Sequence, residues 1–159
     1  NIYYNVEWIN ASMHNPCITP GTAEQHTNAY LKVMDNPKVC VLGHTETADY
    51  PYDYDAVTKA CREKNVAMEF NVSRFRSQTS IQRLHDIILP TCAKNGCYVM
   101  VNSDAHFCSK IGAFKKAEAL LKDIGFPEEL IVNADLERFE NFLKSKGIKT
   151  NAEIEPDED

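Results

Sequence analysis

Residues 97–106, with the sequence CYVMVNSDAH, join an apolar run of strand length to a short polar cluster. The run at 97–101 is rich in aromatic and β-branched side chains, which favour strands. Because the run is continuously apolar rather than alternating, it predicts a strand that is buried on both faces, as in a parallel sheet. The polar residues at 102–106 therefore follow the carboxyl end of a buried strand.

Further apolar runs precede this one, and segments of helical periodicity separate them. The other expected strands are residues 6–9, 39–42 and 66–70. The expected helices run from about 22 to 36, from 53, from 80 to 95, from about 111 to 124, and from 135 to 146. This repeated β-α order predicts an α/β fold in which helices cover a parallel sheet.

Capping residues indicate where several of these helices begin and end. Thr22 and Gln25 have the spacing of a capping box, and Ser80 is expected to open the helix at 80–95. Pro90 is expected to kink that helix, because proline has no N–H to donate to the preceding turn. Gly96 is expected to end it in a left-handed cap.

The chain has 159 residues and a formal net charge of −6, most of which comes from the carboxylates of residues 153–159. We expect one compact domain at residues 1–149 and a solvated acidic tail at 150–159. A nearly neutral body argues against duplex nucleic acid as a partner, because such binding needs a basic face. No apolar run approaches the ~20 residues of a membrane-spanning helix, so no membrane partner is expected.

The six cysteines form no C-x-x-C pair. Cys40 and Cys97 lie in apolar strand-like runs, and Cys61 and Cys92 lie on helical faces. Buried free thiols of this kind are typical of proteins kept in a reducing compartment. We therefore expect unbridged core cysteines and a cytoplasmic protein.

Histidines follow the expected strands at three places: His14, His44 and His106. Because active sites in parallel α/β folds lie at the carboxyl ends of the strands, these side chains are expected at one rim. Asp104 and His106 would face the same way in extended backbone and offer O and N donors to borderline divalent metals. Each histidine alone also fits a capping or loop role, and the D-x-H triplet alone also fits a polar loop. Their joint placement favours a metal site.

Polar residues near the end of the third expected strand extend this rim. Glu69 or Asn71 would reach it as ligand, base or support, although a carboxylate at the mouth of a barrel fits equally well. Arg74 and Arg76 follow, and their guanidinium groups suit a phosphate. A solvated pair of loop arginines is the alternative.

Other features carry less functional information. His26 and His85 lie within expected helices, where a satisfied or exposed histidine is the simpler interpretation. Cys108 lies beside the D-x-H triplet without an activating base in the sequence, which favours an incidental thiol. The sequence lacks G-x-x-x-x-G-K-[ST], G-x-G-x-x-G and G-x-S-x-G, so nucleotide-loop and serine-hydrolase functions have no support.

Several of these stretches together resemble the PHP family, named for polymerase and histidinol phosphatase, and most closely its stand-alone phosphoesterase branch. They occur in the family's order and cover nearly the whole chain from about 7 to 148. The matching stretches are 13–16, 42–44, 67–73, 102–106 and 125–131 with the following Asn133. The family fold is a distorted seven-stranded β/α barrel, similar to a TIM barrel, whose strand ends hold two or three divalent metals, commonly Zn, Mn or Fe.

The resemblance implies a metal-dependent phosphoester hydrolase that acts on a phosphorylated small molecule. His14 and His44 would be ligands of one metal. Asp104 and His106 would bind others of the cluster, and we take these two as the expected catalytic residues.

The same resemblance places Glu69 and Asn71 near the substrate, and with Arg74 and Arg76 they complete the expected substrate-binding set. The chain also departs from the family's pattern around its histidines. Thr45 stands where relatives often have Pro, Glu46 adds a carboxylate close to the rim, and Asn15 stands where many have Glu. These departures bear on substrate preference.

The family's opening His-x-His, a further pair of histidines and a bridging Glu have no counterpart upstream of His14. We therefore expect the C-terminal half of a PHP domain, with parallel βα units that form about half of the barrel and an incomplete set of metal ligands. The isolated chain is expected to be inactive. The alternative is a catalytically incompetent fragment or a non-enzymatic module that acts by assembly or binding.

Half of a barrel would expose strand edges beside residues 6–9 and 97–101, together with an apolar inner face. Unpaired edges and apolar patches bind other chains. The expected partner is therefore either a second copy of this chain, in a homo-oligomer, or the missing N-terminal half.

Overall fold

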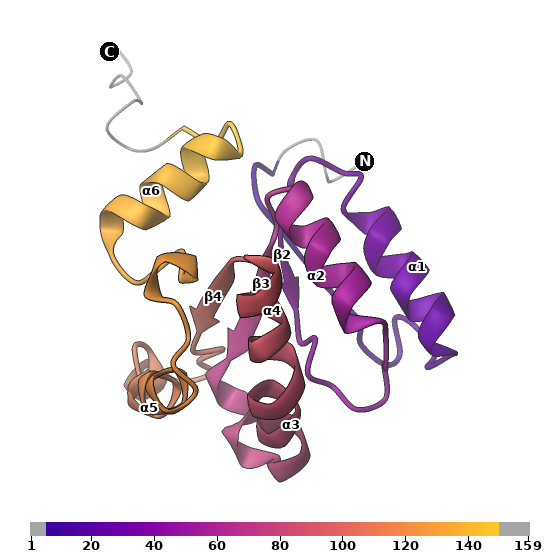
Figure 1. The fold of residues 1–159 in the computed structure, drawn as a ribbon, viewed down its shortest axis with the longest axis horizontal. Coiled ribbons are helices and arrows are strands. Elements are labelled where there is room, and N and C mark those ends of the chain that lie inside the picture. The colour runs from indigo at the N-terminus through magenta and orange to yellow at the C-terminus, as the bar shows by residue number, and fades with distance from the viewer. Residues whose placement is uncertain (1–5, 150–159) are drawn as a thin grey trace.

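The computed structural model describes residues 6–149, and a parallel sheet lies at its centre. Its strands are β1 (Ile9–Ser12), β2 (Val39–Gly43), β3 (Ala67–Asn71) and β4 (Val99–Asn102). They lie side by side in chain order, with helical segments between them (Figure 1). The prediction of an α/β fold built from parallel βα units is confirmed. The expected acidic tail at 150–159 lies outside the described residues.

The first strand lies later in the chain than expected, at Ile9–Ser12 rather than at residues 6–9. Pairing with β2 sets its position: Ile9 is in register with Val39, and the backbone N–H of Ile9 donates to the carbonyl of Lys38 at 2.9 Å. Trp8, which the sequence assigned to the strand, instead packs its ring against Phe142 at 6.0 Å between centroids. The apolar character of residues 6–9 therefore reflects the packing of Trp8 rather than a strand over all four residues.

Within residues 6–149, six α-helices accompany the strands, and capping residues fix several of their ends. They are α1 (Ala23–Val33), α2 (Tyr54–Glu63), α3 (Gln78–Arg83), α4 (Leu89–Asn95), α5 (Lys115–Asp123) and α6 (Leu136–Ser145). The predicted capping box is present before α1, because the Thr22 side chain accepts from the backbone of Gln25 and the Gln25 side chain accepts from the backbone of Thr22. No helix within residues 6–149 is long and apolar enough to span a membrane.

The helix expected at 80–95 is divided by a wider, π-helical turn at Leu84–Ile88. Ser77, not Ser80, caps its start, because the Ser77 hydroxyl accepts the backbone N–H of Ser80 at 3.2 Å. Pro90 lies in the first turn of α4, directly after the π turn, where its missing N–H is tolerated. Gly96 ends α4 with φ 63°, which confirms the left-handed cap.

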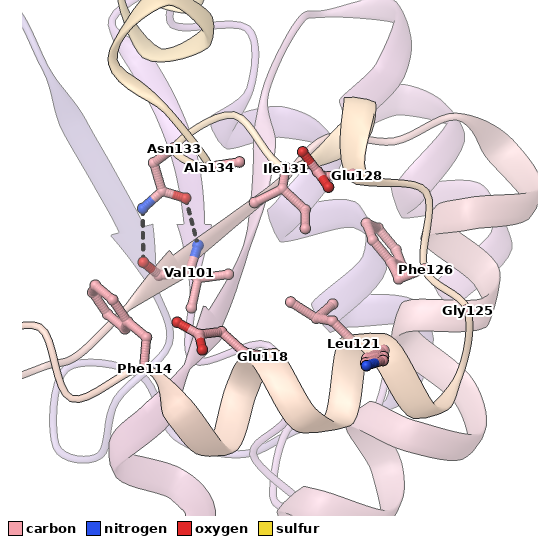
Figure 2. Close-up of a pocket in the computed structure, with 11 residues that line it drawn as sticks. Val101, Phe114, Glu118, Leu121, Gly125, Phe126, Glu128, Ile131, Asn133 and Ala134 are labelled. Atoms are coloured by element: carbon pink, nitrogen blue, oxygen red, sulfur yellow. Dashed lines mark hydrogen bonds between the residues drawn. The ribbon is translucent and has the colours of Figure 1, made fainter.

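The outer edge of β4 is occupied, contrary to the expectation of an open edge beside 97–101. The Asn133 side chain acts as a strand partner: its Nδ2 donates to the carbonyl of Val101 at 2.7 Å, and its Oδ1 accepts the N–H of Val101 at 3.0 Å (Figure 2). The N–H of Val132 donates to the carbonyl of Val99 at 3.0 Å, and Ile131 forms a parallel bridge with Val99. These bonds block the row of groups through which another strand would pair.

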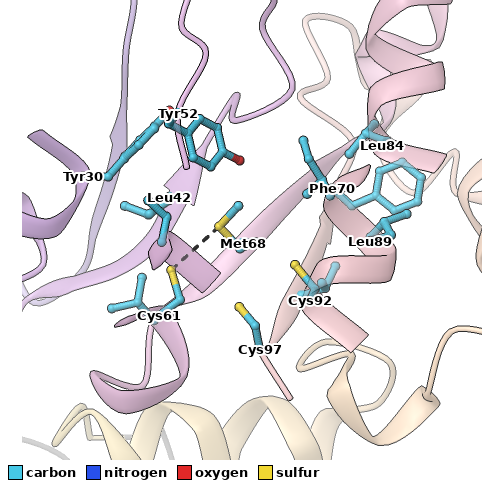
Figure 3. Packing of buried hydrophobic residues seen from close by; sticks show 14 of the residues in the cluster. Tyr30, Leu42, Tyr52, Cys61, Met68, Phe70, Leu84, Leu89, Cys92 and Cys97 are labelled. Atoms are coloured by element: carbon cyan, nitrogen blue, oxygen red, sulfur yellow. Dashed lines mark hydrogen bonds between the residues drawn. The ribbon is translucent and has the colours of Figure 1, made fainter. Parts of the chain in front are cut away.

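One face of the sheet packs against α1, α2 and α4 and forms the main core. Leu42, Met68 and Phe70 project from the strands into this layer, and Tyr30 and Leu89 cover them from the helices (Figure 3). All five side chains are almost fully buried. Burying one such side chain contributes roughly 1.5–3 kcal/mol, so this layer supplies much of the driving force for folding.

The other face of the sheet is divided between an apolar half and a polar half. Val41, Ala67 and Met100 form the apolar half, and Phe142 of α6 covers them. Alternation along β3 places Glu69 on the same face as Ala67, one pleat nearer to the carboxyl end of the strand. Part of the face that was expected to lie open is therefore covered by the last helix, and the remainder carries polar residues.

All six cysteines are free thiols, which confirms the expectation of an unbridged chain. Cys40, Cys61, Cys92 and Cys97 are buried. Cys61, Cys92 and Cys97 gather in the main core below Met68 (Figure 3). The interpretation of these residues as core thiols agrees with the structure.

Candidate active site

The carboxyl ends of the parallel strands bring side chains from distant parts of the sequence to one rim. His14 follows β1, His44 follows β2, Glu69 and Asn71 end β3, and Asp104 follows β4. The rings of His14 and His44 lie 4.6 Å apart between centroids at an interplanar angle of 74°. The rings of His14 and His44 therefore meet as predicted. Hydrogen bonds join His44 to Glu69 and Asn71, and Asn71 in turn bonds to Asp104.

The backbone is strained at two of these positions. His44 has φ 53° and Asp104 has φ 46°, so both occupy the left-handed region that side chains other than glycine rarely adopt. Such a conformation costs on the order of 1 kcal/mol and persists only where the surroundings impose it. Both strained residues directly follow strands that deliver polar groups to the rim, which is where functional sites of this fold class lie.

Glu69 ties three strand ends together. Its Oε2 accepts the backbone N–H of His44 at 2.9 Å, and its Oε1 accepts the Nδ2 of Asn102 at 2.9 Å. Glycine at position 43 leaves room for this contact, because a Cβ there would lie only 3.3 Å from Oε2 of Glu69. Glu69 is 7% exposed, so its carboxylate is held inside the rim by N–H donors.

Asn71 is fully buried and bridges the residues that the sequence singled out. Its Nδ2 lies 3.2 Å from Nδ1 of His44, 3.2 Å from Oδ2 of Asp104 and 3.4 Å from Oε2 of Glu69. Its Oδ1 accepts both the backbone N–H and the hydroxyl of Ser73, at 2.9 and 2.7 Å. Because Ser73 offers two donors, the amide oxygen must face it and the amide nitrogen must face the rim.

Asp104 is held as a carboxylate. Loss of contact with water opposes its ionisation, but hydrogen bonds from Asn71 and Ser73 and the nearby imidazoles of His44 and His106 lower the pKa of the Asp104 carboxyl below its usual value. An ionised Asp104 is the form that a metal or a hydrogen-bond donor on a substrate requires.

His106 is exposed, and its Nδ1 lies 2.9 Å from the backbone carbonyl of Asp104. A carbonyl oxygen accepts only, so this contact assigns the proton to Nδ1 and leaves Nε2 with a free lone pair. A histidine oriented in this way is suited to metal ligation through Nε2.

His44 Nδ1 is the atom on which the site converges. Asn71 Nδ2 lies 3.2 Å and Arg74 Nη2 lies 3.3 Å from it, and carboxylate oxygens of Glu46 and Glu69 lie 3.9 and 3.8 Å from it. Interaction with the Glu46 carboxylate raises the pKa of His44 above its usual value, burial opposes this, and Glu69 adds to the rise.

Arg74 and Arg76, which the sequence could not distinguish as phosphate-binding candidates, occupy different environments. Both belong to the tight turn Val72–Arg76 after β3. Arg74 faces inward, with Nε 3.1 Å from Oε1 of Glu46 and Nη2 near His44, whereas Arg76 is exposed. Arg74 is therefore the arginine that contacts the rim.

Sequence reasoning placed Glu46 close to the rim but missed its partner, and it missed the contacts of Ser73 and Asn102. Ser73 bonds to Asp104 through its hydroxyl, Asn102 holds Glu69, and Glu46 pairs with Arg74. Ser73 could have been found, because a serine two positions after an asparagine often donates to its side chain. The Asn102–Glu69 and Glu46–Arg74 contacts join residues 33 and 28 positions apart in the sequence, and no local pattern predicts them.

Curated proteins similar to this chain bear one common name. A probable phosphatase of Clostridium novyi is 40% identical over 149 residues, which cover 92% of this chain and 61% of that protein. One of Clostridium acetobutylicum is 38% identical over 159 residues, and one of Aliivibrio fischeri is 36% identical over 146. The chain is related to probable phosphatases. It spans about 60% of the length of these proteins. No family model matches it.

The side chains of the rim can be compared with the ligands that divalent metals accept. Imidazole and carboxylate groups such as His14, His44 and Asp104 are ligands that Zn, Mn and Fe accept. Within residues 6–149, however, no group of three or more His, Cys, Asp or Glu side chains is arranged to hold an ion. The donor types fit a divalent metal, and the described residues assemble only part of a coordination sphere.

A cavity of about 650 Å³ lies elsewhere, beside the outer edge of β4. Figure 2 shows Phe114, Glu118 and Leu121 on one side of it and Phe126 on another. Its lining is mainly apolar and includes none of the residues predicted for the site. The cavity is therefore separate from the strand-end rim.

Proposed function

We propose that this chain forms part of a metal-dependent phosphoester hydrolase of the PHP type. The observation that carries the proposal is the convergence of His14, His44 and Asp104 after the carboxyl ends of the parallel strands β1, β2 and β4. The relationship to probable phosphatases supports the reaction class, and the ordered resemblance to PHP proteins supports the metal dependence.

In this proposal His14 and His44 share one metal, and Asp104 and His106 contribute to others. A divalent metal, when bound, polarises a phosphoryl oxygen and lowers the pKa of a coordinated water. Residues 6–149 offer an incomplete ligand set, and the remaining donors would come from outside them.

The chain's own residues would bind and orient the substrate and the ligands. Arg74 reaches the rim with an N–H donor and would bind a phosphoryl oxygen, since a guanidinium matches phosphate geometry. Asn71 and Ser73 keep Asp104 ionised and fix the direction of its carboxylate. Glu69 holds the backbone of His44 and so sets the position of that ring.

Titration of the chain with inorganic phosphate, with and without Zn²⁺, tests the proposal. We expect phosphate to bind only after the chain has taken up Zn²⁺, because the metal and Arg74 together supply the positive charge. A chain that takes up no Zn²⁺ at micromolar concentration contradicts metal ligation by the strand-end residues of this chain. A chain that takes up Zn²⁺ but shows no phosphate binding contradicts the phosphoester function and favours the non-enzymatic module.

A further inference from the structure

The Glu46 carboxylate is charged, fully buried and adjacent to the site. It lies two residues after His44, in the loop that follows β2, and has no exposed surface. Its Oε1 forms an ion pair with Nε of Arg74 at 3.1 Å and lies 3.9 Å from Nδ1 of His44. Neither of its carboxylate oxygens accepts a hydrogen bond of good geometry from residues 6–149. Its favourable contacts therefore come mainly from the charges of these two neighbours.

Stability alone does not account for such a carboxylate. Removing an ion from water costs several kcal/mol, and a buried ion pair often contributes no more than apolar residues of the same size. Glu46 also lacks the additional hydrogen bonds that normally offset this cost. The pair therefore calls for an explanation in which the position of the arginine matters.

The geometry of Arg74 supplies that explanation. Glu46 holds the guanidinium at Nε, and the same planar group presents Nη2 at 3.3 Å from Nδ1 of His44. The Arg74 side chain is 35% exposed, so its outer edge can reach a ligand, whereas the Glu46 side chain is 0% exposed. A planar group fixed at one edge presents its remaining N–H donors in a set direction.

We propose that Glu46 is a positioning residue, which holds the Arg74 guanidinium against the rim so that it can bind a phosphate group of the substrate. This inference rests on the proposed function, because it assumes that the bound group is a phosphate. Glu46 itself touches no substrate and acts through Arg74. Without its carboxylate, Arg74 would sample many rotamers and would pay the cost of ordering each time a ligand bound.

The first test observes Arg74 directly and needs no ligand. In ¹⁵N-edited NMR spectra the Nε–H signal of Arg74 is assigned as the one that disappears in Arg74→Lys. We expect Glu46→Gln to shift this signal and to speed its exchange with water about tenfold or more, because an ion pair protects the proton. Glu63→Gln, which removes an exposed carboxylate from α2, is the matched control and should leave the signal unchanged. An unchanged signal in Glu46→Gln overturns the proposal.

The second test measures the dissociation constant of inorganic phosphate for the Zn²⁺-loaded chain in a double-mutant cycle. Arg74→Gln should weaken binding about tenfold, since hydrogen bonds to charged groups are strong. Glu46→Gln should weaken it roughly threefold or more alone and should have no further effect in the Arg74→Gln background. An equal loss in both backgrounds would show that Glu46 acts without Arg74 and overturns the proposal. Lys32→Gln, an exposed charge removal on α1, controls for net charge.

Two further outcomes separate this inference from the proposed function. If Glu46→Gln fails to fold, Glu46→Asp serves in its place: it keeps the charge but shortens the side chain, and an unchanged Arg74 signal in that variant overturns the proposal. If the Arg74 signal depends on Glu46 but the wild-type chain binds no phosphate, the proposed function fails while the positioning of Arg74 by Glu46 stands.

Discussion

The Nδ2 of Asn71 donates to the Oδ2 of Asp104 at 3.2 Å and so joins the end of β3 to the loop after β4. The same nitrogen lies near His44 and Glu69, so one neutral amide separates groups that would otherwise repel or compete. Asn71 is fully buried, and its replacement cannot be compensated by water from outside. The rim therefore depends on a residue that is itself uncharged.

Asn71→Asp should destabilise the metal-free chain in a pH-dependent way. The new carboxyl would lie beside Glu69 and Asp104, so burial and like charge would raise its pKa in the folded state above the unfolded value of about 3.9. The unfolded state then loses its proton at lower pH than the folded state. The loss of stability should be small below about pH 4 and should grow to about 3 kcal/mol as the pH rises toward 7.

Urea unfolding at several pH values in the presence of EDTA measures this effect. Asn36→Asp is the matched control, because Asn36 is exposed and its side chain accepts a hydrogen bond that an aspartate also accepts. A difference between Asn71→Asp and wild type that is constant from pH 4 to 7 would show that Asn71 does not separate carboxylates as described.

Metal content should depend on strand-end histidines and not on helical ones. We expect His44→Ala and Asp104→Ala to reduce the Zn or Mn bound per chain, because both are proposed ligands. His85→Ala and His26→Ala should leave it unchanged: His85 is half-buried and pairs with Asp86, and His26 is buried with Nδ1 at 2.8 Å from the carbonyl of Pro51. Elemental analysis of the purified proteins decides the matter. Equal metal loss from both pairs would show that placement after a strand carries no information.

Arg74→Gln and Arg76→Gln should differ in their effect on phosphate binding. Arg74 contacts the rim, and its loss should weaken binding about tenfold. Arg76 is exposed on the same turn, so its removal should change the dissociation constant less than twofold. Calorimetric titration of the two variants under identical salt conditions provides the comparison. A larger loss from Arg76→Gln would mean that the turn after β3 rearranges when ligand binds.

The isolated chain should not turn over an aryl phosphate in the presence of Mn²⁺ or Zn²⁺. The reason is the incomplete ligand set, since residues 6–149 contain no group of three metal-binding side chains in place. Release of nitrophenolate from nitrophenyl phosphate is the measurement. Turnover that His106→Ala abolishes would demonstrate a self-sufficient site and contradict this prediction.

The fold was predictable where the relevant information is local. The apolar runs that became β2, β3 and β4 are continuous because both faces of those strands are buried, and the capping box before α1 needs only Thr22 and Gln25. The position of β1 was not predictable in this way, because its register depends on Val39 and because Trp8 packs against a helix near the end of the chain.

In the candidate site, too, local features were predictable from the sequence and long-range contacts were not. The histidines and Asp104 were predicted because they follow strands, and the topology brings strand ends together. The choice of Arg74 over Arg76 depends on the direction of a short turn and on Glu46, a partner 28 positions away in the sequence. A local sequence pattern cannot predict a contact over this separation, and only the folded chain reveals it.

We expect the chain to self-associate, and the outer edge of β1 is the surface that remains open for this contact. The edge of β4 is paired with residues 131–133, and α6 covers the apolar half of the adjacent face. Among residues 6–149, no strand pairs with the outer edge of β1. Phe107 and Ile111, which are 76% and 73% exposed, add apolar surface in the loop after β4. An open edge of this kind pairs with other chains, so we expect dimers or larger species at micromolar concentration.

A proline substitution can test this edge without disturbing the sheet. The N–H of Ile9 donates to the carbonyl of Lys38, just before β2. The register shift between Ile9 and Asn10 places the extra residue, Cys40, in β2, so the alternation along β1 is kept and points the N–H of Asn10 outward. Asn10→Pro should therefore remove an outward donor and spare the pairing of β1 with β2. Sedimentation equilibrium should show self-association of the wild type and a shift toward monomer in Asn10→Pro. A stable wild-type monomer would mean that the edge of β1 is protected. Equal association of both proteins would assign the contact to another surface, and the exposed Phe107 would then be the next residue to replace.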